Sequence, residues 1–394
     1  MKCRFCNTET RMFLSLGSTP LANSFLKKEQ LNQMESTYPL DLNVCQECFL
    51  VQVDEFEAPA DIFSNYAYFS GYSISWLKHC KEYVDMIVEG CPTLGQVVEI
   101  GSNDGYLLQY FKEKGIYVLG VEPAENIAEI ARKKGIPTVT KFFGIKTANK
   151  LKEEGFKADL LIGNNVLAHV PDLNDFVAGL KILLKPDGII TMEFPHLMKL
   201  IENVQFDTIY HEHFSYFSFM TVEKVFAAHG LTIHHVEELP THGGSLRIWA
   251  CHEGNNFPST SVHLLREIER QAGYNSIDRY VSFAQMTAKR KRVILADLIR
   301  IKNAGKSIVG YGAAAKGNTL LNYCGIGTDF LDYIVDKNPH KQGLYTPGSR
   351  IPIEPVEKLR ETKPDYVFIL PWNISKEIKK QVSFIEEWGG KFVN

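Results

Sequence analysis

Strand-length apolar runs alternate with amphipathic stretches of helix length between residues 96 and 195. The pattern is clearest in "QVVEIGSNDGYLLQYFKEKG", "YVLGVEPAENIAEIARKKG" and "ADLLIGNNVLAHVPDLNDFVAGLKILLKPDGIITMEFP". A second series of the same kind starts at residue 306 with "SIVGYGAAAKGNTLLNYCG", "DYIVDKNPHKQG" and "DYVFILPW". Alternation of apolar strands with helices is the rhythm of βαβ units and predicts a parallel, doubly wound sheet. We therefore expect an α/β protein that uses a Rossmann-like architecture twice.

The remaining segments have simpler patterns. The stretch "LKHCKEYVDMIVE" has the apolar spacing of an amphipathic helix. Residues 220 to 253 predict a helix, "TVEKVFAAHG", followed by two strands, "LTIHHVEEL" and "GSLRIWACHE". A charged helical region is expected from about residue 260 to 303.

Four of the eight cysteines form two C-x-x-C pairs near the start of the chain, "CRFC" and "CQEC". Each pair lets two thiolates face one ion, and four thiolates suit tetrahedral zinc. A zinc ion with four protein ligands keeps no open position, which favours a structural over a catalytic role. The expected zinc ligands are Cys3, Cys6, Cys45 and Cys48.

Composition restricts the classes of partner. The chain has 394 residues, 45% of them hydrophobic, and a formal net charge of −3 with acidic and basic residues intermixed. The length and the hydrophobic fraction indicate a globular protein. The net charge gives no excess of basic residues of the kind that nucleic-acid-binding proteins carry. We see neither an apolar run of membrane-spanning length nor a signal-peptide core, so we expect a cytoplasmic protein without a membrane partner.

The turn in "VVEIGSNDGYLL" indicates what the first Rossmann-like unit binds. Glu99 lies at the end of a strand, Gly101 permits a tight turn, and Gly105 lies where the helix is expected to open. The spacing E-x-G-x-x-x-G differs from the G-x-G-x-x-G of dinucleotide sites. Asn103 and Asp104 occupy the region where a pyrophosphate would lie, and the aspartate would repel it. A cationic cofactor without phosphate fits better.

Two further signals follow at regular intervals. Glu122 ends the next strand about 20 residues on, where a carboxylate can accept hydrogen bonds from both ribose hydroxyls. Asn164 and Asn165 end a third strand, at the carboxyl edge where open α/β sheets bind ligands. Taken in this order, the three signals indicate S-adenosylmethionine.

The stretch "FDTIYHEHFSYFS", residues 206 to 218, combines acid–base groups with aromatic residues. Its aromatics can exclude water, a histidine can act as a base near neutral pH, and a tyrosine can donate to an oxyanion. In an extended strand Tyr210 and Glu212 would share one face, and His211 and His213 the other. A turn or helix start would remove this conflict, and the sequence leaves the question open.

The C-terminal series has its own glycine loop, "GYGAAAKGN". Gly310, Gly312 and Gly317 are spaced like a pyrophosphate cradle, and Lys316 adds positive charge inside it. Asp336 ends the next strand, where a ribose contact would fall. Read alone, this loop indicates NAD.

Nearly the whole chain resembles the S-adenosylmethionine-dependent sugar C-methyltransferases, which methylate nucleotide-linked 4-keto-deoxysugars. The shared segments are the "CRFC"/"CQEC" module, "VVEIGSNDGYLL", "NNVLAHVPDL", "YHEHFSYFS" and "YGAAAKGNTLLNY". The resemblance implies methylation of a carbon beside the keto group, with C3 expected, through an enolate made by a base. It also implies a three-part layout: a zinc-binding, substrate-contacting domain (residues 1–75), a methyltransferase domain (76–255) and a Rossmann-like nucleotide-binding domain (256–394).

The resemblance also implies roles for individual residues. His213 is the expected general base, beside Tyr210 and Glu212, with His211 and Tyr210 as alternatives for that role. His169 is expected to contact the keto oxygen, and Tyr66 or Tyr68 to close the pocket. The C-terminal glycine loop is expected to hold the nucleotide diphosphate (dTDP, GDP or similar) through Gly312, Lys316, Gly317, Asn318 and Asp336.

Two other functions remain possible on the sequence. One is an NAD-linked nucleotide-sugar oxidoreductase that uses the C-terminal loop. The other is a zinc module that presents nucleic acid or protein to a methyltransferase domain. The segments "CRFCNTETRMF" and "CQECFLVQVDEFE" have no basic stripe, which disfavours the second.

Overall fold

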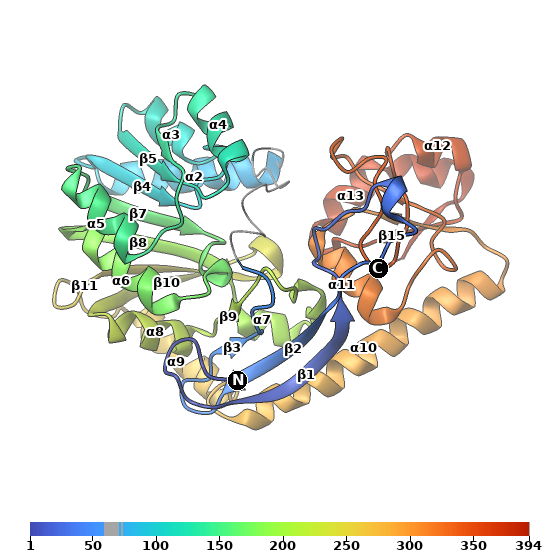
Figure 1. Ribbon diagram of the computed structural model, residues 1–394, viewed down its shortest axis with the longest axis horizontal. Helices are drawn as coiled ribbons and strands as arrows, with labels where there is room; N and C mark the ends of the chain where they lie inside the picture. The colour runs from blue at the N-terminus through green and yellow to red at the C-terminus, as the bar shows by residue number, and fades with distance from the viewer. Residues whose placement is uncertain (59–70, 72–73, 394) are drawn as a thin grey trace. The chain divides into compact units, whose positions relative to one another are not determined.

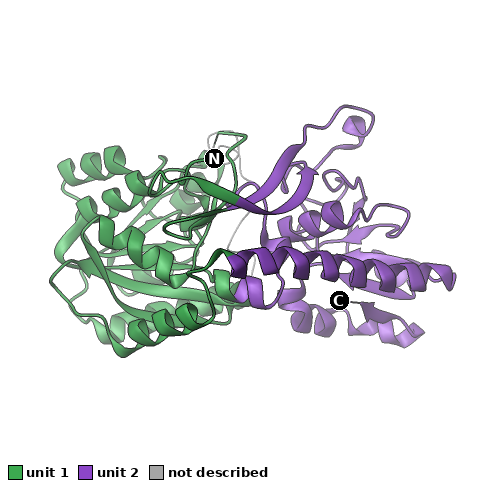
Figure 2. Cartoon of the chain, turned by 90° about the horizontal axis from the view of Figure 1, so that it is seen from below, with its two compact units in different colours: residues 1–11, 44–198, 214–277 green, residues 12–43, 199–213, 278–394 purple. Residues whose placement is uncertain are grey.

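The computed structural model describes residues 1–58, 71 and 74–393, which form two compact units (Figure 2). Unit 1 comprises Met1–Arg11, Val44–Met198 and Phe214–Ile277, and unit 2 comprises Met12–Asn43, Lys199–His213 and Asp278–Asn394. Each unit is thus assembled from three separate stretches of the chain. The domain boundaries expected from the sequence, after residues 75 and 255, are a different division and stay a prediction.

A seven-stranded sheet in the order β10-β11-β8-β7-β4-β5-β6 forms the centre of unit 1 (Figure 1). The strands from β4 to β8 pair in parallel, while β11 pairs antiparallel with β8 and with β10. The strands are β4 (Gln96–Ile100), β5 (Tyr117–Val121), β6 (Thr138–Val139), β7 (Ala158–Asn164), β8 (Leu184–Pro195), β10 (Leu231–Leu239) and β11 (Ser245–His252).

Helices cover both faces of this sheet, because alternate side chains of the apolar strands enter different cores. Val97 belongs to a buried cluster with Tyr83 and Phe111 on one face, whereas Val98 belongs to a second buried cluster that also contains Phe176 and Val225. The helices of unit 1 are α2 (Ile74–Gly90), α3 (Leu108–Glu113), α4 (Glu125–Lys133), α5 (Ile145–Glu153), η3 (Leu167–His169), α6 (Leu173–Leu183), α8 (Phe219–Ala228), η5 (Thr241–Gly243) and α9 (Thr260–Gln271).

These elements match the sequence prediction for residues 76 to 271, with one correction. Helix α3 begins at Leu108, three residues after Gly105, where the helix was expected to open. Gly105 instead has φ of 76° and lies in the turn before the helix. Its ideal Cβ would lie 3.0 Å from Ile136, so close packing as well as backbone conformation favours glycine there.

A second, smaller sheet has the order β1-β2-β3-β9. Its strands are β1 (Thr10–Thr19), β2 (Tyr38–Cys45), β3 (Val51–Gln52) and β9 (Ser215–Tyr216), of which β1 and β2 run from one unit into the other along the chain. The short helix η1 (Lys28–Gln30) lies between β1 and β2 in sequence, and α7 (Leu197–Glu202) follows β8.

Unit 2 contains the second Rossmann-like sheet, a five-stranded parallel sheet in the order β14-β13-β12-β15-β16. Its strands are β12 (Ile308–Tyr311), β13 (Ile334–Val335), β14 (Ile353–Glu354), β15 (Tyr366–Ile369) and β16 (Lys391–Val393). Its helices are η4 (Phe206–Thr208), α10 (Ile277–Asn303), α11 (Ala315–Cys324), α12 (Lys358–Thr362), η6 (Trp372–Ile374), α13 (Ser375–Gln381) and η7 (Ser383–Trp388). Together with unit 1, this sheet confirms the α/β class and the repeated architecture.

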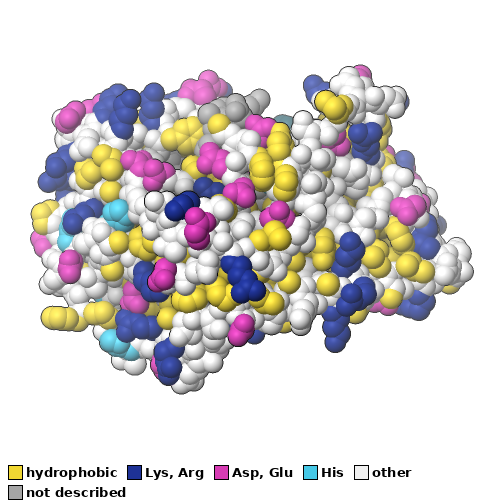
Figure 3. Space-filling model, turned by 60° about the horizontal axis from the view of Figure 1, so that its bottom comes forward, with side chains coloured by type: hydrophobic (Ala, Val, Ile, Leu, Met, Phe, Trp, Pro, Cys, Tyr) yellow, Lys and Arg dark blue, Asp and Glu magenta, His cyan; other side chains and the backbone are white. Residues whose placement is uncertain are grey.

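The surface carries charges of both signs. On the face drawn in Figure 3, Lys and Arg side chains are interspersed with Asp and Glu. This agrees with the intermixed charge of the sequence. Across the described residues, the helices are all too short or too polar to cross a membrane.

Candidate active site

The four cysteines of the two C-x-x-C pairs meet in unit 1, where their sulfur atoms all lie within 4.8 Å of one another. The Sγ–Sγ distances are 3.5 Å for Cys3–Cys48, 3.4 Å for Cys6–Cys45 and 3.6 Å for Cys6–Cys48. Zinc bound to thiolates at about 2.3 Å in a tetrahedron needs sulfurs about 3.8 Å apart, so the cluster fits this ion. The backbone N–H groups of Glu47 and Cys48 donate to the Cys45 sulfur, as suits a thiolate ligand.

The carboxyl edge of the unit 1 sheet has a natural ligand position between β4 and β7. The chain order reverses there, because β4 is flanked by β5 on one side and β7 on the other. Open α/β sheets bind ligands outside such a switch point. Gly101, the first residue after β4, has φ of 65°, and a side chain on it would collide with Val166, which follows β7. The glycine therefore keeps the two strand ends close.

Two buried polar atoms at this edge have no hydrogen-bond partner in the described chain. They are Oδ1 of Asp104 and Oδ1 of Asn165. The Glu99 carboxyl is buried at the same edge beside the Tyr106 hydroxyl, which hydrogen-bonds to it, and burial raises the pKa of Glu99 well above its ordinary value. The other oxygen of Asp104 accepts from Lys134 Nζ at 2.9 Å. Unsatisfied buried acceptors are costly, so this edge fits a ligand that brings N–H or O–H donors.

Glu122 follows β5 directly and is held by two backbone groups. Its Oε2 accepts from Asn103 N–H at 3.0 Å, and its Oε1 accepts from Ala124 N–H at 2.9 Å. Burial raises the pKa of this carboxyl, and the two N–H groups act against that shift. A carboxylate oxygen can accept more than one hydrogen bond. Glu122 is thus fixed in orientation and still able to accept from a ribose diol.

Unit 2 holds the Tyr-His-Glu-His segment, in which residues 210 to 213 form a turn. The N–H of His213 donates to the carbonyl of Tyr210 at 3.0 Å. The turn brings the Tyr210 hydroxyl to 2.9 Å from His213 Nε2, with the ring centroids 4.1 Å apart. The face conflict expected for an extended strand therefore does not arise.

The two residues inside this turn have separate partners. Glu212 Oε2 accepts from Asn23 Nδ2 at 2.7 Å, and burial raises the pKa of Glu212 to about 7 although Lys341 lies nearby. His211 Nε2 donates to the carbonyl of Pro39 at 3.1 Å, and burial lowers its pKa. Glu212 is thus a carboxyl that can exchange a proton near neutral pH.

The glycine loop after β12 opens helix α11 in the same unit. Gly312 has φ of 91°, and a Cβ there would lie 2.6 Å from Pro371. Gly317 packs against Leu370, its ideal Cβ 3.0 Å from the Leu370 Cβ. Asp336 accepts from the loop N–H of Ala313 at 2.7 Å. That N–H is therefore already used within the protein.

Lys316 and its neighbours link the glycine loop to the segment that precedes the turn. Lys316 Nζ donates to Asn373 Oδ1 at 2.9 Å. Burial lowers the pKa of Lys316 and the charge of Asp207 opposes that shift, while Asp207 itself accepts from Trp372 Nε1 at 2.6 Å. Thr319 donates to the carbonyl of Ile209 at 2.9 Å. Asn318 donates to the Ala22 carbonyl and has a buried Oδ1 with no partner among the described residues.

Comparison with protein-family models divides the chain into three known domains. Residues 3–63 match a "Putative zinc binding domain", residues 76–236 a "Methyltransferase domain" and residues 240–394 a "C-methyltransferase C-terminal domain". The C-methyltransferase NovU of Streptomyces niveus is 36% identical to the chain, over all of the chain and 94% of NovU. The chain belongs to the C-methyltransferase family.

Other similarities of this C-methyltransferase are partial. A ubiquinone biosynthesis O-methyltransferase of Bartonella bacilliformis is 27% identical over 96 residues, which are 24% of this chain and 39% of that enzyme. Two solved structures align with about half of the chain. The PH0226 protein of Pyrococcus horikoshii is 17% identical with a TM-score of 0.40, over 50% of this chain and 100% of that one. The magnesium protoporphyrin IX methyltransferase of Synechocystis with bound SAM is 17% identical with a TM-score of 0.36, over 46% of this chain and 82% of that one. The family assignment rests on NovU and the domain models.

These findings confirm the predicted family, the S-adenosylmethionine-dependent methyltransferase class and the zinc-binding N-terminal domain. The roles of individual residues stay predictions, as does the nucleotide-sugar substrate. His169 ends helix η3 of unit 1 and is half-buried. Tyr66 and Tyr68 lie outside the described residues.

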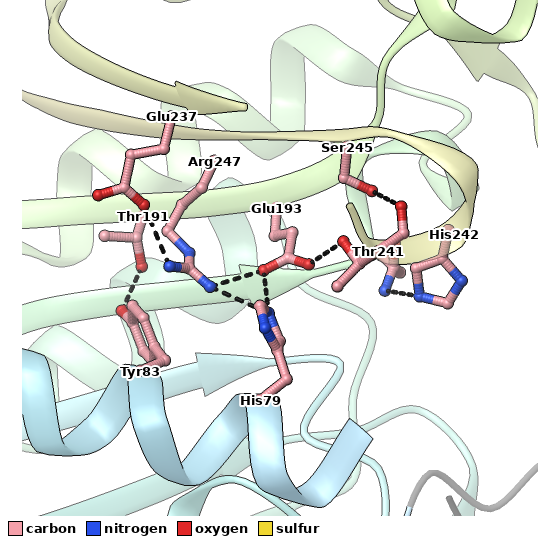
Figure 4. A network of polar contacts seen from close by, with 10 residues as sticks. His79, Tyr83, Thr191, Glu193, Glu237, Thr241, His242, Ser245 and Arg247 are labelled. Atoms are coloured by element: carbon pink, nitrogen blue, oxygen red, sulfur yellow. Dashed lines mark hydrogen bonds and ion pairs between the residues drawn. The ribbon is translucent and has the colours of Figure 1, made fainter. Parts of the chain in front are cut away.

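Sequence reasoning missed a polar cluster in unit 1. Glu193 of β8, Arg247 of β11 and His79 of α2 form a triangle of contacts at 2.8 to 3.1 Å (Figure 4). A signal was present, because Glu193 and Arg247 are charged residues inside apolar strand segments, "TMEFP" and "SLRIWAC". Charged residues are rarely buried without a partner, so each could have been predicted to have one.

Proposed function

We propose that this C-methyltransferase transfers a methyl group from S-adenosylmethionine to a carbon beside the keto group of a nucleotide-linked 4-keto-deoxysugar, with C3 as the expected carbon. The observation that carries the proposal is the buried turn of unit 2, where Tyr210 and His213 are hydrogen-bonded and the pKa of Glu212 is raised to about 7. Methylation of carbon requires prior loss of a proton, and these groups can accept one. Full-length similarity to a C-methyltransferase supports the same reaction.

The donor fits the carboxyl edge of the unit 1 sheet. Glu122 would accept from the ribose hydroxyls, and Asp104 and Asn165 offer buried acceptors that lack partners in the described chain. The buried Glu99 carboxyl lies at the same edge. Gly101, Asn103 and Asn164 are the other residues expected at this edge. When bound, S-adenosylmethionine supplies an electrophilic methyl group. The protein's part there is to hold the donor and to satisfy its polar groups.

The Tyr210–His213 pair is suited to removing the proton. A neutral His213 accepts the Tyr210 hydroxyl proton at Nε2, so the phenol oxygen can take the proton of the substrate C–H as it releases its own. The net result is an imidazolium on His213 and an enolate on the sugar. His169 is proposed to donate to the keto oxygen and so to stabilise the enolate. The enolate carbon would take the methyl group that S-adenosylmethionine supplies, with S-adenosylhomocysteine as the leaving group.

The glycine loop of unit 2 is proposed to bind the nucleotide diphosphate. Gly312 and Gly317 allow close backbone approach, and Lys316 supplies a cation. Asn318 and Asp336 complete the proposed substrate contacts. This loop also suits NAD, and the family assignment favours the sugar nucleotide.

A single incubation tests the proposal. Zinc-loaded protein is mixed with S-adenosylmethionine and a panel of dTDP- and GDP-linked 4-keto-deoxysugars, and the products are analysed by mass spectrometry and NMR. We expect a mass gain of one methylene, a new methyl signal on a carbon beside the ketone, and release of S-adenosylhomocysteine. Methylation on oxygen or nitrogen would contradict the proposal. Consumption of NADH without methylation, measured in parallel, would favour the oxidoreductase.

A further inference from the structure

Glu193 is the centre of a buried network in unit 1 that has no assigned role. Its side chain has no solvent exposure and accepts three hydrogen bonds of 2.8 Å, from His79 Nε2, Arg247 Nη2 and the hydroxyl of Thr241 (Figure 4). His79 and Arg247 hold the pKa of Glu193 below its ordinary value against the effect of burial. Glu193 is therefore an ionised anchor that joins α2, β8, β11 and η5.

The network ends at Asn165, at the edge where the methyl donor is proposed to bind. The backbone N–H of Asn165 donates to the Glu193 carbonyl at 2.7 Å. Thr241, held by Glu193, is followed by His242, which has φ of 54°. This left-handed conformation is uncommon for a histidine. It places His242 Nε2 3.1 Å from Asn165 Nδ2, which donates to it.

This contact decides which end of the Asn165 amide is available. With Nδ2 donating to His242, Oδ1 is left as a buried acceptor that has no partner in the part of the chain that the structure describes. The ring of Trp76 supports the arrangement, since it lies 5.1 Å from the His79 ring and 5.4 Å from the His242 ring. His79 and His242 thus share one aromatic neighbour.

We propose that Thr241 and His242 are positioning residues for the methyl donor. Glu193 fixes Thr241, the turn after Thr241 fixes His242, and His242 orients the Asn165 amide so that its oxygen accepts a hydrogen bond from an N–H group of S-adenosylmethionine. The inference deepens the proposed function and rests on it, because it assumes a donor at the β4–β7 edge.

A matched pair at Thr241 tests the inference in the full-length, zinc-loaded protein. Thr241→Val removes only the hydroxyl that Glu193 accepts, whereas Thr241→Ser keeps it. We expect Thr241→Val to raise the Kd for S-adenosylhomocysteine, measured by calorimetry, about 3- to 10-fold, and Thr241→Ser to stay within about twofold of wild type. The KM for S-adenosylmethionine should rise with the Kd while kcat at saturating donor changes little.

Two further variants make the result decisive. Thr147→Val removes a hydroxyl of helix α5 that donates to the Phe142 carbonyl, and it should leave the Kd unchanged. His242→Asn tolerates the left-handed conformation but is too short to reach Asn165, and it should raise the Kd as Thr241→Val does. It becomes the deciding variant if Thr241→Val does not fold.

The outcomes separate the two hypotheses. Wild-type protein that does not bind S-adenosylhomocysteine would overturn the proposed function and with it this inference. Wild-type binding together with unchanged affinity in Thr241→Val would overturn the inference alone. A Thr241→Ser protein as weak as Thr241→Val would also overturn it, because the hydroxyl would not be the cause.

Discussion

The hydroxyl of Tyr210 lies 2.9 Å from Nε2 of His213, within a turn closed by the hydrogen bond from His213 N–H to the Tyr210 carbonyl. We propose that these two residues, three positions apart, act as one acid–base unit. If the phenol donates to Nε2 of the imidazole, as the proposed mechanism requires, removal of either group should disable the pair. Glu212, between them in sequence, accepts instead from Asn23 Nδ2.

We predict that His213→Asn and Tyr210→Phe both abolish proton removal from the substrate while ligand binding persists. Each change deletes one member of the pair, and loss of a general base costs about 10² to 10⁴ in rate. The measurement is exchange of the C–H beside the ketone in D2O, followed by NMR in the presence of S-adenosylhomocysteine. Wild type should exchange, and both variants should exchange at least about 100-fold more slowly.

A matched histidine separates this effect from a general loss of structure. His263→Asn makes the same change on the exposed surface of α9, and exchange should continue at the wild-type rate. Exchange in His213→Asn as fast as in wild type would show that proton removal does not depend on His213, and that Tyr210 alone or His211 is the base. Exchange lost in His213→Asn but retained in Tyr210→Phe would show that His213 acts without the phenol.

Glu212 should make stability depend on pH. Burial raises its pKa from 4.5 to about 7, so the folded state favours the protonated form. The contribution of Glu212 to the free energy of unfolding is fully present below pH 4.5. It falls by about 3 kcal/mol in total as the pH rises through 7. Wild type should therefore lose about 3 kcal/mol of unfolding free energy relative to Glu212→Gln between pH 4.5 and 9.

Denaturant unfolding of both proteins across this pH range gives the difference directly. The control is Glu361→Gln, an exposed glutamate of helix α12, whose difference from wild type should stay flat with pH. A flat difference for Glu212→Gln as well would mean that Glu212 titrates as an ordinary surface carboxyl.

The strands and helices could be predicted well because their information is local. Runs such as "QVVEI" and "ADLLIG" are apolar throughout, and strands buried on both faces need that pattern. The placement of residues 199 to 213 in unit 2 could not be predicted in this way. It depends on contacts such as Thr319 to Ile209 and Trp372 to Asp207, which join residues more than 100 positions apart. A polar turn carries no periodic signal for such partners.

Some parts of the candidate site could be predicted from the sequence and others could not. The C-x-x-C pairs and the glycine turns have fixed spacings set by backbone geometry, so residue numbers followed from the sequence. The Glu193 network has no such spacing, because its members come from α2, β8, η5 and β11. The sheet register pairs Glu193 with Arg247, and side-chain contacts add His79 and Thr241. A charged residue inside an apolar strand indicated that Glu193 and Arg247 each need a partner, but the sequence did not show which residue that partner is.

Loss of one zinc ligand should unfold the local structure around the cysteine cluster. Cys45→Ser replaces a buried thiolate with a weaker ligand, and structural zinc contributes directly to folding. We expect purified Cys45→Ser to contain much less than one zinc per chain and to melt at a lower temperature. Cys91→Ser, at a half-buried cysteine outside the cluster, should keep full zinc content. Normal folding of Cys45→Ser without zinc would contradict the structural role.

Glu122→Gln should weaken binding of the methyl donor. The substitution keeps the size of the side chain but replaces a charged acceptor by an amide, one end of which donates. Since a hydrogen bond to a charged group contributes about 1.5 to 3 kcal/mol, the Kd for S-adenosylhomocysteine should rise about 10- to 100-fold. Glu125→Gln, three residues on and exposed at the start of α4, is the matched control. Equal affinity in Glu122→Gln and Glu125→Gln would exclude a ribose contact by Glu122.

Lys316→Met should impair binding of the nucleotide sugar and leave the methyl donor unaffected. The lysine sits at the glycine loop of unit 2, and burial lowers its pKa, so its charge is held in a poorly solvated place where a diphosphate would interact strongly. We expect the KM for the nucleotide sugar to rise roughly 10- to 100-fold, as for the loss of a charge-assisted hydrogen bond.

The matching measurement is the Kd for S-adenosylhomocysteine, which should equal that of wild type, since the proposed donor edge belongs to unit 1. Lys380→Met removes an exposed lysine of helix α13 and controls for net charge. Whether the effect depends on the diphosphate can be checked with dTDP as a competitive inhibitor. Lys316→Met should lower the affinity for dTDP by the same factor as the affinity for the nucleotide sugar. Lys316→Met could instead bind S-adenosylhomocysteine more weakly and dTDP as tightly as wild type. In that case the glycine loop would not be the diphosphate site, and the assignment of the two ligands to the two units would be wrong.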